Sequence, residues 1–303
     1  MNRRDFITAT GASSAFVGLG GLGLNSCQAF SGTHITVLHT NDVHSHIDPF
    51  PLDHSEFPNM GGLARRAALI EQIRSENSNT LLLDAGDIFQ GTPYFNFYGG
   101  ELEFKLMSKL KYDAATIGNH DFDNGLTGLL AQMPHAKFEM LSANYDFSNT
   151  VMNGFVEPYS TFLLDGIKIG VFGLGIELKG LVTEALYKET IYRDPIEIAQ
   201  DMSRTLKGEL NCDLVICLSH LGHEYNDELR PSDVLLASKT AEIDLIIGGH
   251  THTFLEQPVI KRNLNNKEVL VNQVGCFGIN LGRVDFYFDN KDKVNGSGIS
   301  ITV

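Results

Sequence analysis

Short apolar runs alternate with amphipathic stretches along the chain from residue 33 onward. The apolar runs are rich in leucine and β-branched residues and precede Gly, Asn or Asp, as buried strands do; they cover residues 34–39, 80–84, 114–117, 138–143, 214–218 and 243–247. Apolar positions at helical spacing lie between them, over residues 62–74, 102–110, 126–132, 196–206 and 233–238. This alternation predicts an α/β domain with buried sheets.

Two stretches have the pattern of hairpins and do not fit a purely parallel sheet. One covers residues 160–173 and carries Asp165-Gly166 at its turn, and the other covers residues 269–288. We therefore expect a mixed sheet, or two packed sheets, flanked by helices. No Pro/Ser-rich linker divides residues 33–303, which predicts one domain over this range.

The charge of the chain argues against one class of function. Its 303 residues include 37 Asp and Glu against 23 Lys and Arg, which is a formal net charge of −14. A protein that binds polymeric nucleic acid normally presents a basic face, so we expect no such partner. Cys212, Cys217 and Cys276 lack the paired spacing of a zinc site, and we expect them to be buried apolar residues.

The first 29 residues have the composition of an export signal. Arg3 and Arg4 precede a weakly apolar, uncharged run rich in Gly, Ala and Ser over residues 6–24, which is a poor membrane anchor. This start resembles a bacterial twin-arginine signal, and an ordinary secretory signal is the alternative. The sequence Leu-Asn-Ser-Cys ending at Cys27 also resembles a lipoprotein box, in which Cys27 would carry a lipid anchor. We expect export from a bacterial cytoplasm, either to the periplasm or to a lipid-anchored position in the cell envelope.

Candidate chemistry is found where the predicted strands end. Nearly every strand is followed at once by Asp, Asn or His, in the segments 40–46 (TNDVHSH), 84–87 (DAGD), 118–123 (GNHDFD), 219–223 (SHLGH) and 248–252 (GGHTH). Ligands of open α/β sheets bind beyond the carboxyl ends of the strands, so these segments should meet at one edge. Each segment alone has a plainer explanation, such as a capped turn or an exposed histidine. Together, they indicate a metal site.

The order of these motifs resembles the signature of the calcineurin-like metallophosphoesterase superfamily. That signature reads D-x-H, G-D, G-N-H-[DE], H and then G-G-H-x-H. Residues 38–42 (LHTND), 118–123 and 219–223 resemble its 5′-nucleotidase branch, and the resemblance extends over residues 33–289. It implies a four-layer αββα fold, in which mixed β-sheets pack as a sandwich flanked by helices.

The resemblance also implies a site for two divalent metal ions. Asp87 resembles the ligand that bridges them. One ion would be held by Asp42, His44, Asp87 and His252, and the other by Asp87, Asn119, His220 and His250. Mixed nitrogen and oxygen ligands suit Mn, Fe, Co or Zn, and two such ions can clamp an in-line displacement at phosphorus. Related nucleotidases often carry Gln where this chain has His252, which is a departure from the pattern.

Catalysis by such a site needs no Ser or Cys nucleophile, because bridging metal ions lower the pKa of the bound water that attacks phosphorus. His120 resembles the catalytic histidine of the family, which stabilises charge on the phosphoryl group and helps to protonate the leaving oxygen. Asp123 would orient its imidazole by a hydrogen bond, as a dyad; the alternative is that His120 only orients a ligand. Among the other histidines, we expect His39, His46 and His223 to orient ligands and His34, His54 and His135 to lie at the surface.

The nucleotidases that the chain resembles carry a second, C-terminal domain for substrate recognition, and the resemblance covers only their catalytic domain. Either a separately encoded partner supplies that domain, or the enzyme acts alone with loose specificity, or it acts on another phosphoester. The motifs favour a nucleotide substrate and an exported, metal-dependent hydrolase of the 5′-nucleotidase type. The alternatives are a 2′,3′-cyclic nucleotide phosphodiesterase, a nucleotide-sugar hydrolase or a non-catalytic exported binding module, although such a module would be expected to lose ligands or the dyad.

Overall fold

The computed structural model describes residues 32–303, apart from Glu228. The N-terminal residues, on which the export signal and the lipid-modified Cys27 are predicted, lie outside the described residues, and both stay predictions. Within the described range, no helix combines the length and apolar character needed to cross a bilayer.

The first of two large sheets has six strands in the order β14-β13-β1-β2-β3-β4. Its β1, β2, β3 and β4 are parallel neighbours, whereas β13 pairs antiparallel with both β1 and β14. The strands are β1 (Thr33–Thr40), β2 (Thr80–Asp84), β3 (Ala114–Thr116), β4 (Glu139–Leu141), β13 (Asn280–Asp289) and β14 (Asp292–Thr302).

The second sheet also has six strands, in the order β11-β12-β10-β9-β7-β6. Four of them, β12, β10, β9 and β7, are parallel, and the two edge strands are antiparallel to their neighbours. They are β6 (Tyr159–Leu164), β7 (Ile167–Gly175), β9 (Leu214–His220), β10 (Leu245–Gly248), β11 (Val259–Arg262) and β12 (Glu268–Asn272). The short β5 (Tyr145–Asp146) and β8 (Ile191–Tyr192) form a separate antiparallel pair.

Alternation along the buried strands places apolar side chains on both faces of each sheet. In β2, Leu81 and Leu83 enter the core between the two sheets, whereas Leu82 packs in the core on the outer face of its sheet. In β9, Leu218 belongs to the same intersheet core and Cys217 to the core on the other outer face. Strands buried on both faces lose their polar positions, which explains the continuous apolar runs in the sequence.

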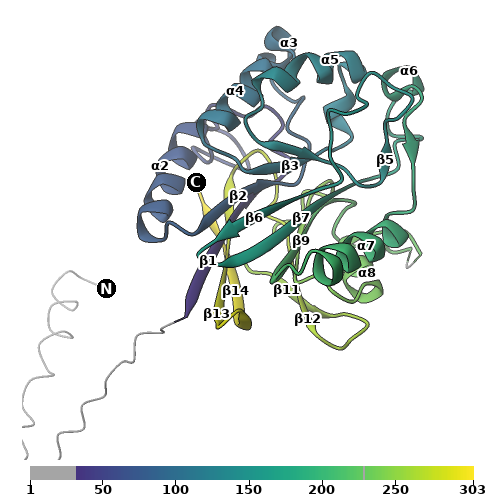
Figure 1. Ribbon diagram of the computed structural model, residues 1–303. Helices are drawn as coiled ribbons and strands as arrows, with labels where there is room; N and C mark the ends of the chain where they lie inside the picture. The colour runs from purple at the N-terminus through teal and green to yellow at the C-terminus, as the bar shows by residue number, and fades with distance from the viewer. Residues whose placement is uncertain (1–31, 228) are drawn as a thin grey trace, which may run out of the picture. The chain divides into compact units, whose positions relative to one another are not determined.

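Helices cover the two outer faces and complete four layers. Figure 1 shows α2, α4 and α5 on one side of the strands and α7 and α8 on the other, and residues of these helices belong to the two outer cores. The predicted αββα sandwich is therefore confirmed. The helices are α2 (Leu63–Glu76), α3 (Pro93–Tyr98), α4 (Glu101–Lys109), α5 (Gly125–Gln132), α6 (Glu184–Tyr187), α7 (Pro195–Arg204), which a π-helix (Thr205–Glu209) continues, and α8 (Asp233–Lys239).

One of the two predicted hairpins is present and the other is wrong. β6 and β7 form the hairpin with Asp165-Gly166 at its turn. Residues 269–288 form no hairpin, because β12 lies in the second sheet and β13 in the first, so that the connection between them crosses from one sheet to the other. The antiparallel neighbour of β12 is β11, and those of β13 are β1 and β14. The cysteines Cys212, Cys217 and Cys276 are buried and free, as predicted.

Candidate metal centre and active site

The predicted site residues meet at the edge of the sandwich where its central parallel strands end. Asp42 follows β1, Asp87 follows β2, Asn119 follows β3, His220 is the last residue of β9 and His250 follows β10. Backbone hydrogen bonds join the first two of these loops, since Asp42 N donates to Gly86 O at 2.9 Å and His44 N donates to Asp87 O at 3.0 Å. Both sheets therefore contribute side chains to one place.

Two groups of side chains with metal-ligand chemistry lie there. Asp42, His44 and His252 form the first group, and Asp87, His220 and His250 form the second; within each group the ligand atoms lie within 4.8 Å of one another. The groups adjoin, because Asp87 Oδ2 lies 3.1 Å from His220 Nε2 in its own group and 3.8 Å from His44 Nε2 in the other. Asp87 thus stands between them, as a shared ligand would.

Asn119 completes the set of predicted ligands. Its Oδ1 lies 2.8 Å from His250 Nδ1, which brings its amide oxygen to the second group. The backbone N–H of His250 donates to Asp42 Oδ1 at 2.9 Å, so that the loop after β10 is tied to the carboxylate of the first group. The structure therefore brings together all seven predicted ligands.

The hydrogen bonds of the histidines leave nitrogens that suit a cation. His220 donates from Nδ1 to Ala85 O at 2.7 Å, and its fully buried Nε2 faces Asp87 Oδ2 at 3.1 Å. His44 donates from Nδ1 to Phe89 O at 3.1 Å, and its Nε2 faces His252 Nε2 at 3.0 Å. Imidazole nitrogens gathered beside buried carboxylates are the donor set of a divalent metal site.

The backbone at the site is held in an unfavourable conformation. Five of the seven residues have positive φ angles, namely 50° at Asp42, 49° at His44, 55° at Asp87, 72° at His250 and 52° at His252. Residues other than Gly seldom adopt this region, and such strain concentrates at functional sites. Glycine at 118 permits the close approach of two loops, because a Cβ atom there would lie 2.2 Å from Asp87 Oδ1.

His120 and Asp123 form the predicted pair at the side of the metal groups. His120 Nδ1 lies 3.0 Å from Asp123 Oδ2, and the His120 ring packs edge-on against the His44 ring at 5.3 Å. The hydrogen bond to Asp123 raises the pKa of His120 above its ordinary value, against the effect of burial and with the help of the charge on Asp87. The His120 side chain is 39% exposed, so a substrate can reach it.

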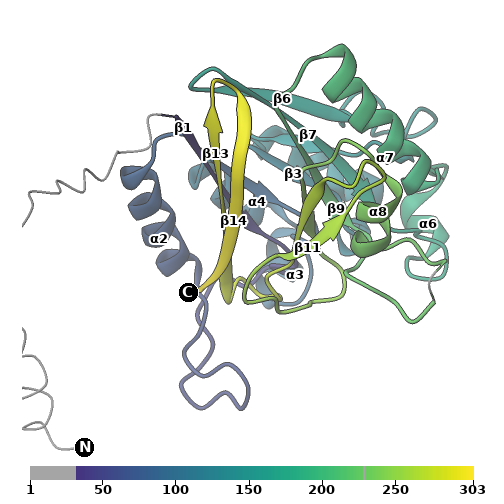
Figure 2. The ribbon, with the colours of Figure 1, turned by 90° about the horizontal axis from the view of Figure 1, so that it is seen from below.

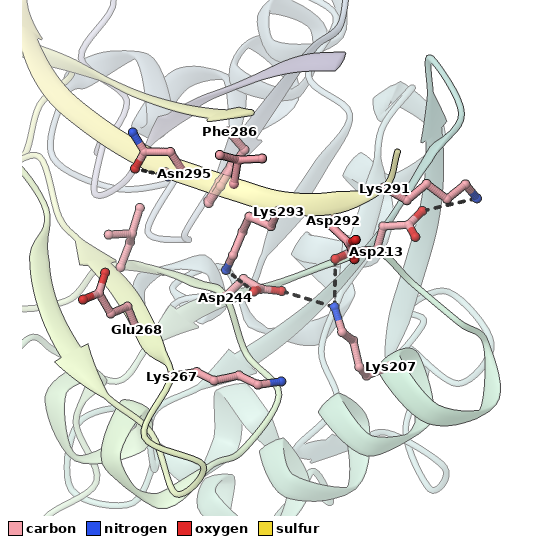
Figure 3. A pocket seen from close by; sticks show the side chains of 13 residues that line it. Lys207, Asp213, Asp244, Lys267, Glu268, Phe286, Lys291, Asp292, Lys293 and Asn295 are labelled. Carbon is pink, nitrogen blue, oxygen red and sulfur yellow. Dashed lines mark hydrogen bonds and ion pairs between the residues drawn. The ribbon is translucent and has the colours of Figure 1, made fainter. Parts of the chain in front are cut away.

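A cavity of 440 Å³ joins these groups to solvent, which is large enough for a small ligand. It is lined by His44, His46, Asp87, Gln90, Gly91, Asn119, His120, His250, His252 and Phe277. Another cavity of 440 Å³, shown in Figure 3, lies near the amino ends of β9 and β10 at residues such as Asp213 and Asp244. Three of its lysines, Lys207, Lys291 and Lys293, form ion pairs with these two carboxylates.

Comparison with known proteins agrees with this geometry. The family model of the calcineurin-like phosphoesterases matches residues 35–254. The chain belongs to the calcineurin-like phosphoesterase family. It is 35% identical over 281 residues to a snake venom 5′-nucleotidase of Crotalus adamanteus, covering 86% of this chain and 46% of that protein. It is 35% identical over 302 residues to the trifunctional nucleotide phosphoesterase protein of Bacillus subtilis, covering 89% of this chain and 19% of that protein.

Solved structures of related proteins have the same fold. A 5′-nucleotidase precursor from Thermus thermophilus superposes with a TM-score of 0.81 at 32% identity, covering 89% of this chain and 55% of that one. The chain spans about half the length of the Crotalus relative that it matches. Its two Asp/His groups fit the two divalent metal ions that calcineurin-like phosphoesterases use.

The electrostatics of this calcineurin-like phosphoesterase follow from burying acids and imidazoles together. Burial opposes the protonation of His220, but the charge of Asp87 outweighs it and raises the pKa of His220 to about 10. Burial would raise the pKa of Asp87, but His220 and His44 lower it below its ordinary value. Burial and a charged His220 lower the pKa of His250 to about 4. Asp87 therefore stays ionised, as a metal ligand must.

Sequence reasoning assigned no role to Asp121, which builds the loop that carries Asp87. The buried Asp121 carboxylate accepts four backbone N–H groups, from Asp87, Ile88, Phe89 and Gly118, at 2.8–3.1 Å. Burial and the charge of Asp87 raise its pKa to about 7, and the N–H groups oppose this shift. Its place in the G-N-H-D segment was the signal that could have identified it.

Asn41 has a comparable role for the first group. Its amide donates to Asp42 Oδ2 at 2.7 Å and to Gly275 O at 2.6 Å, and its Oδ1 accepts the N–H of Val274 at 3.0 Å. These bonds orient the Asp42 carboxylate and join the loop after β1 to the loop after β12. Asn41 is fully buried and lies next to a predicted ligand, yet sequence reasoning gave it no role.

The remaining histidines agree only in part with their predicted roles. His46 supports the backbone of a ligand, because its Nδ1 lies 3.0 Å from His44 O. His223 adjoins the loop after β10 through its backbone N–H, which donates to Thr251 Oγ1 at 3.0 Å. The prediction that His39 orients a ligand is wrong, because its ring pairs with Asn272 and its Nδ1 has no partner. His34, His54 and His135 are partly exposed.

Proposed function

We propose that this chain is a metal-dependent phosphoester hydrolase that removes phosphate from nucleotides. The position of Asp87 between two adjoining groups of ligands carries this proposal, because one carboxylate within reach of both groups makes a dinuclear centre. One ion would be held by Asp42, His44, Asp87 and His252, and the other by Asp87, Asn119, His220 and His250.

Residues of the chain would supply the acid catalysis and the orientation of the substrate. When bound, the two cations supply Lewis acidity, a clamp for the phosphoryl oxygens and an activated water. His120 faces the same cavity and, oriented through Nδ1 by Asp123, has its Nε2 available to stabilise the phosphoryl group and to protonate the leaving oxygen. Side chains from the loops that follow strands of both sheets line the cavity and would hold the phosphate end of the substrate in one orientation.

The substrate class rests on the relatives, several of which are named as 5′-nucleotidases. A 2′,3′-cyclic nucleotide phosphodiesterase and a nucleotide-sugar hydrolase are chemically close alternatives, since the same centre can cleave diesters. The intact His120–Asp123 pair favours an enzyme over a binding module, because a module that only binds has no need of a general acid.

The experiment is a chromatographic assay of the products formed from AMP, 2′,3′-cyclic AMP, a nucleotide sugar and p-nitrophenyl phosphate. Cleavage gives phosphate and adenosine from AMP, an adenosine monophosphate from the cyclic diester, a nucleoside monophosphate and a sugar phosphate from the nucleotide sugar, and phosphate and p-nitrophenol from the last ester. We expect AMP to be cleaved with added Mn²⁺ and the activity to be lost with a chelator. Preferred cleavage of the cyclic or sugar ester would replace the nucleotidase assignment. The absence of chelator-sensitive turnover of every ester would favour the binding module.

We also propose that residues 1–29 direct export to the bacterial envelope, through a twin-arginine signal and with Cys27 as the lipidated residue of the mature chain. The Arg3-Arg4 pair and the small residue before Cys27 support this. Mass spectrometry of the mature protein tests it: a diacylglyceryl-modified N-terminal cysteine is expected, and an unmodified terminus beyond Cys27 contradicts the anchor.

We further propose that residues 33–303 form one catalytic domain and that a recognition domain outside these residues assists in binding the substrate. The relatives that share this domain are longer, and the chain covers 46% of the Crotalus protein. Addition of a candidate partner should raise kcat/KM for nucleotides but leave p-nitrophenyl phosphate hydrolysis unchanged. Equal rates with and without it on all substrates would show that the chain acts alone.

A further inference from the structure

Phe277 has a backbone conformation that its residue type disfavours. It lies in the connection that crosses from β12 to β13, and its φ angle is 60°. Its N–H donates to Asp42 O at 2.7 Å, which fixes this conformation beside the first metal group. Positive φ is rare for a bulky residue, and glycines already occupy positions 275 and 278 around it. A strained Phe where Gly would fit indicates that the ring itself has a use.

The ring of Phe277 is placed against the candidate active site. Its centroid lies 5.8 Å from that of His252 and 6.0 Å from that of His44, and its ring lines the cavity of the site. The ring is only partly buried. Among the described residues that line this cavity, Phe277 has the only apolar side chain.

Further aromatic rings pack around Phe277. His46 lies 4.4 Å from it by ring centroids and is itself held by the hydrogen bond to His44 O. Figure 2 shows the connection between β1 and α2, to which His46 belongs, extending away from the sheets. Together with Phe277, an aromatic cluster is formed by His46, Phe50, His54, Phe57 and Phe254, with successive centroids 4.4–6.0 Å apart.

We propose that the Phe277 ring, packed against His46, is the surface of the cavity against which the nucleobase of the substrate lies. This inference rests on the proposed function and specifies how the substrate is selected. The phosphate would occupy the metal groups, and the cavity of 440 Å³ has room for the remainder of a nucleotide. A flat base gains most from an exposed ring whose position is already fixed, because little freedom is lost on stacking.

The test uses two substrates that differ only in the base, AMP and ribose 5-phosphate, with the full chain and added Mn²⁺. Phe277→Gly removes the ring and relieves the positive φ, so the variant should fold. We expect the ratio of kcat/KM for AMP to kcat/KM for ribose 5-phosphate to fall about 5- to 150-fold, the range for loss of one base–aromatic stack. Phe277→Tyr should retain the ratio. Phe97→Ala, which removes an exposed ring that does not line the cavity, is the matched control.

Two outcomes would overturn the proposal. If Phe277→Gly lowers both kcat/KM values equally, or neither, the ring does not select the base. If the unmodified chain cleaves neither ester, the proposed hydrolysis is wrong, and the contact between Phe277 and the base is then tested by calorimetric binding to the Mn²⁺-loaded chain. In that case Phe277→Gly must weaken the binding of AMP more than the binding of ribose 5-phosphate. An equal effect on both would refute the proposed contact between Phe277 and the base, independently of the proposed hydrolysis.

Discussion

Substitution of Asp121 by Asn gives a sharp prediction about the loop that carries Asp87. In the structure, Asp121 Oδ1 accepts the N–H groups of Ile88 and Phe89, and Oδ2 accepts those of Asp87 and Gly118. An Asn amide has one acceptor oxygen, so either orientation turns its NH₂ group toward two of these donors. Each buried donor left without a partner costs about 1–3 kcal/mol, or about 2–6 kcal/mol for the two. Removal of the buried charge, whose cost raises the pKa of Asp121, offsets part of this loss in the free energy of unfolding.

That loss is a large part of the stability of a typical domain, about 5–15 kcal/mol. We would measure it by urea unfolding at about pH 8, above the pKa of Asp121, in the presence of chelator so that metal binding does not contribute. Metal titration should then show weaker binding, because the same loop places Asp87.

Asp123→Asn is the matched control for this experiment. Asp123 lies two residues away and is partly exposed, and its carboxylate contacts His120 instead of backbone donors. We expect its stability to change by less than about 0.5 kcal/mol, as for other surface substitutions, while its activity falls. Unchanged stability together with unchanged metal affinity in Asp121→Asn would refute the claim that Asp121 holds the loop.

Three further predictions follow from the geometry. His120→Ala should lower kcat by roughly 10²–10⁴ with both metals retained, and an unchanged rate would reject the dyad. Asp87→Asn should lose metal, as measured by elemental analysis, and full occupancy of both positions would contradict bridging. Asp285 accepts hydrogen bonds from Thr36, Arg283 and His34, and these outweigh the effect of burial and lower its pKa. The contribution of Asp285 to the stability of the fold is therefore complete above the unfolded pKa of about 3.9. It is lost as the pH falls through the lower folded pKa. Asp285→Asn should thus destabilise the chain by about 1–3 kcal/mol at pH 7 and by little in acid, and a pH-independent loss would refute this assignment.

The sequence alone determined the elements and the chemistry of the site. Strands buried on both faces appear as continuous apolar runs, so β2 and β9 could be located from local composition. The polar residues that follow such strands share one edge whatever the details of packing, because parallel strands have their carboxyl ends on the same side. The convergence of Asp42, Asp87 and His250 could therefore be predicted from the sequence alone.

Only the tertiary structure decided what depends on contacts between distant segments. The apolar pattern of residues 269–288 could not show that β12 and β13 belong to different sheets. The apolar pattern of a strand is the same whichever strand it pairs with. Asp121, Asn41 and Phe277 act through hydrogen bonds and a φ angle that arise when loops from several strands meet. Residue type and spacing predict which side chains can bind a metal, but the support of those side chains is a property of the folded loops.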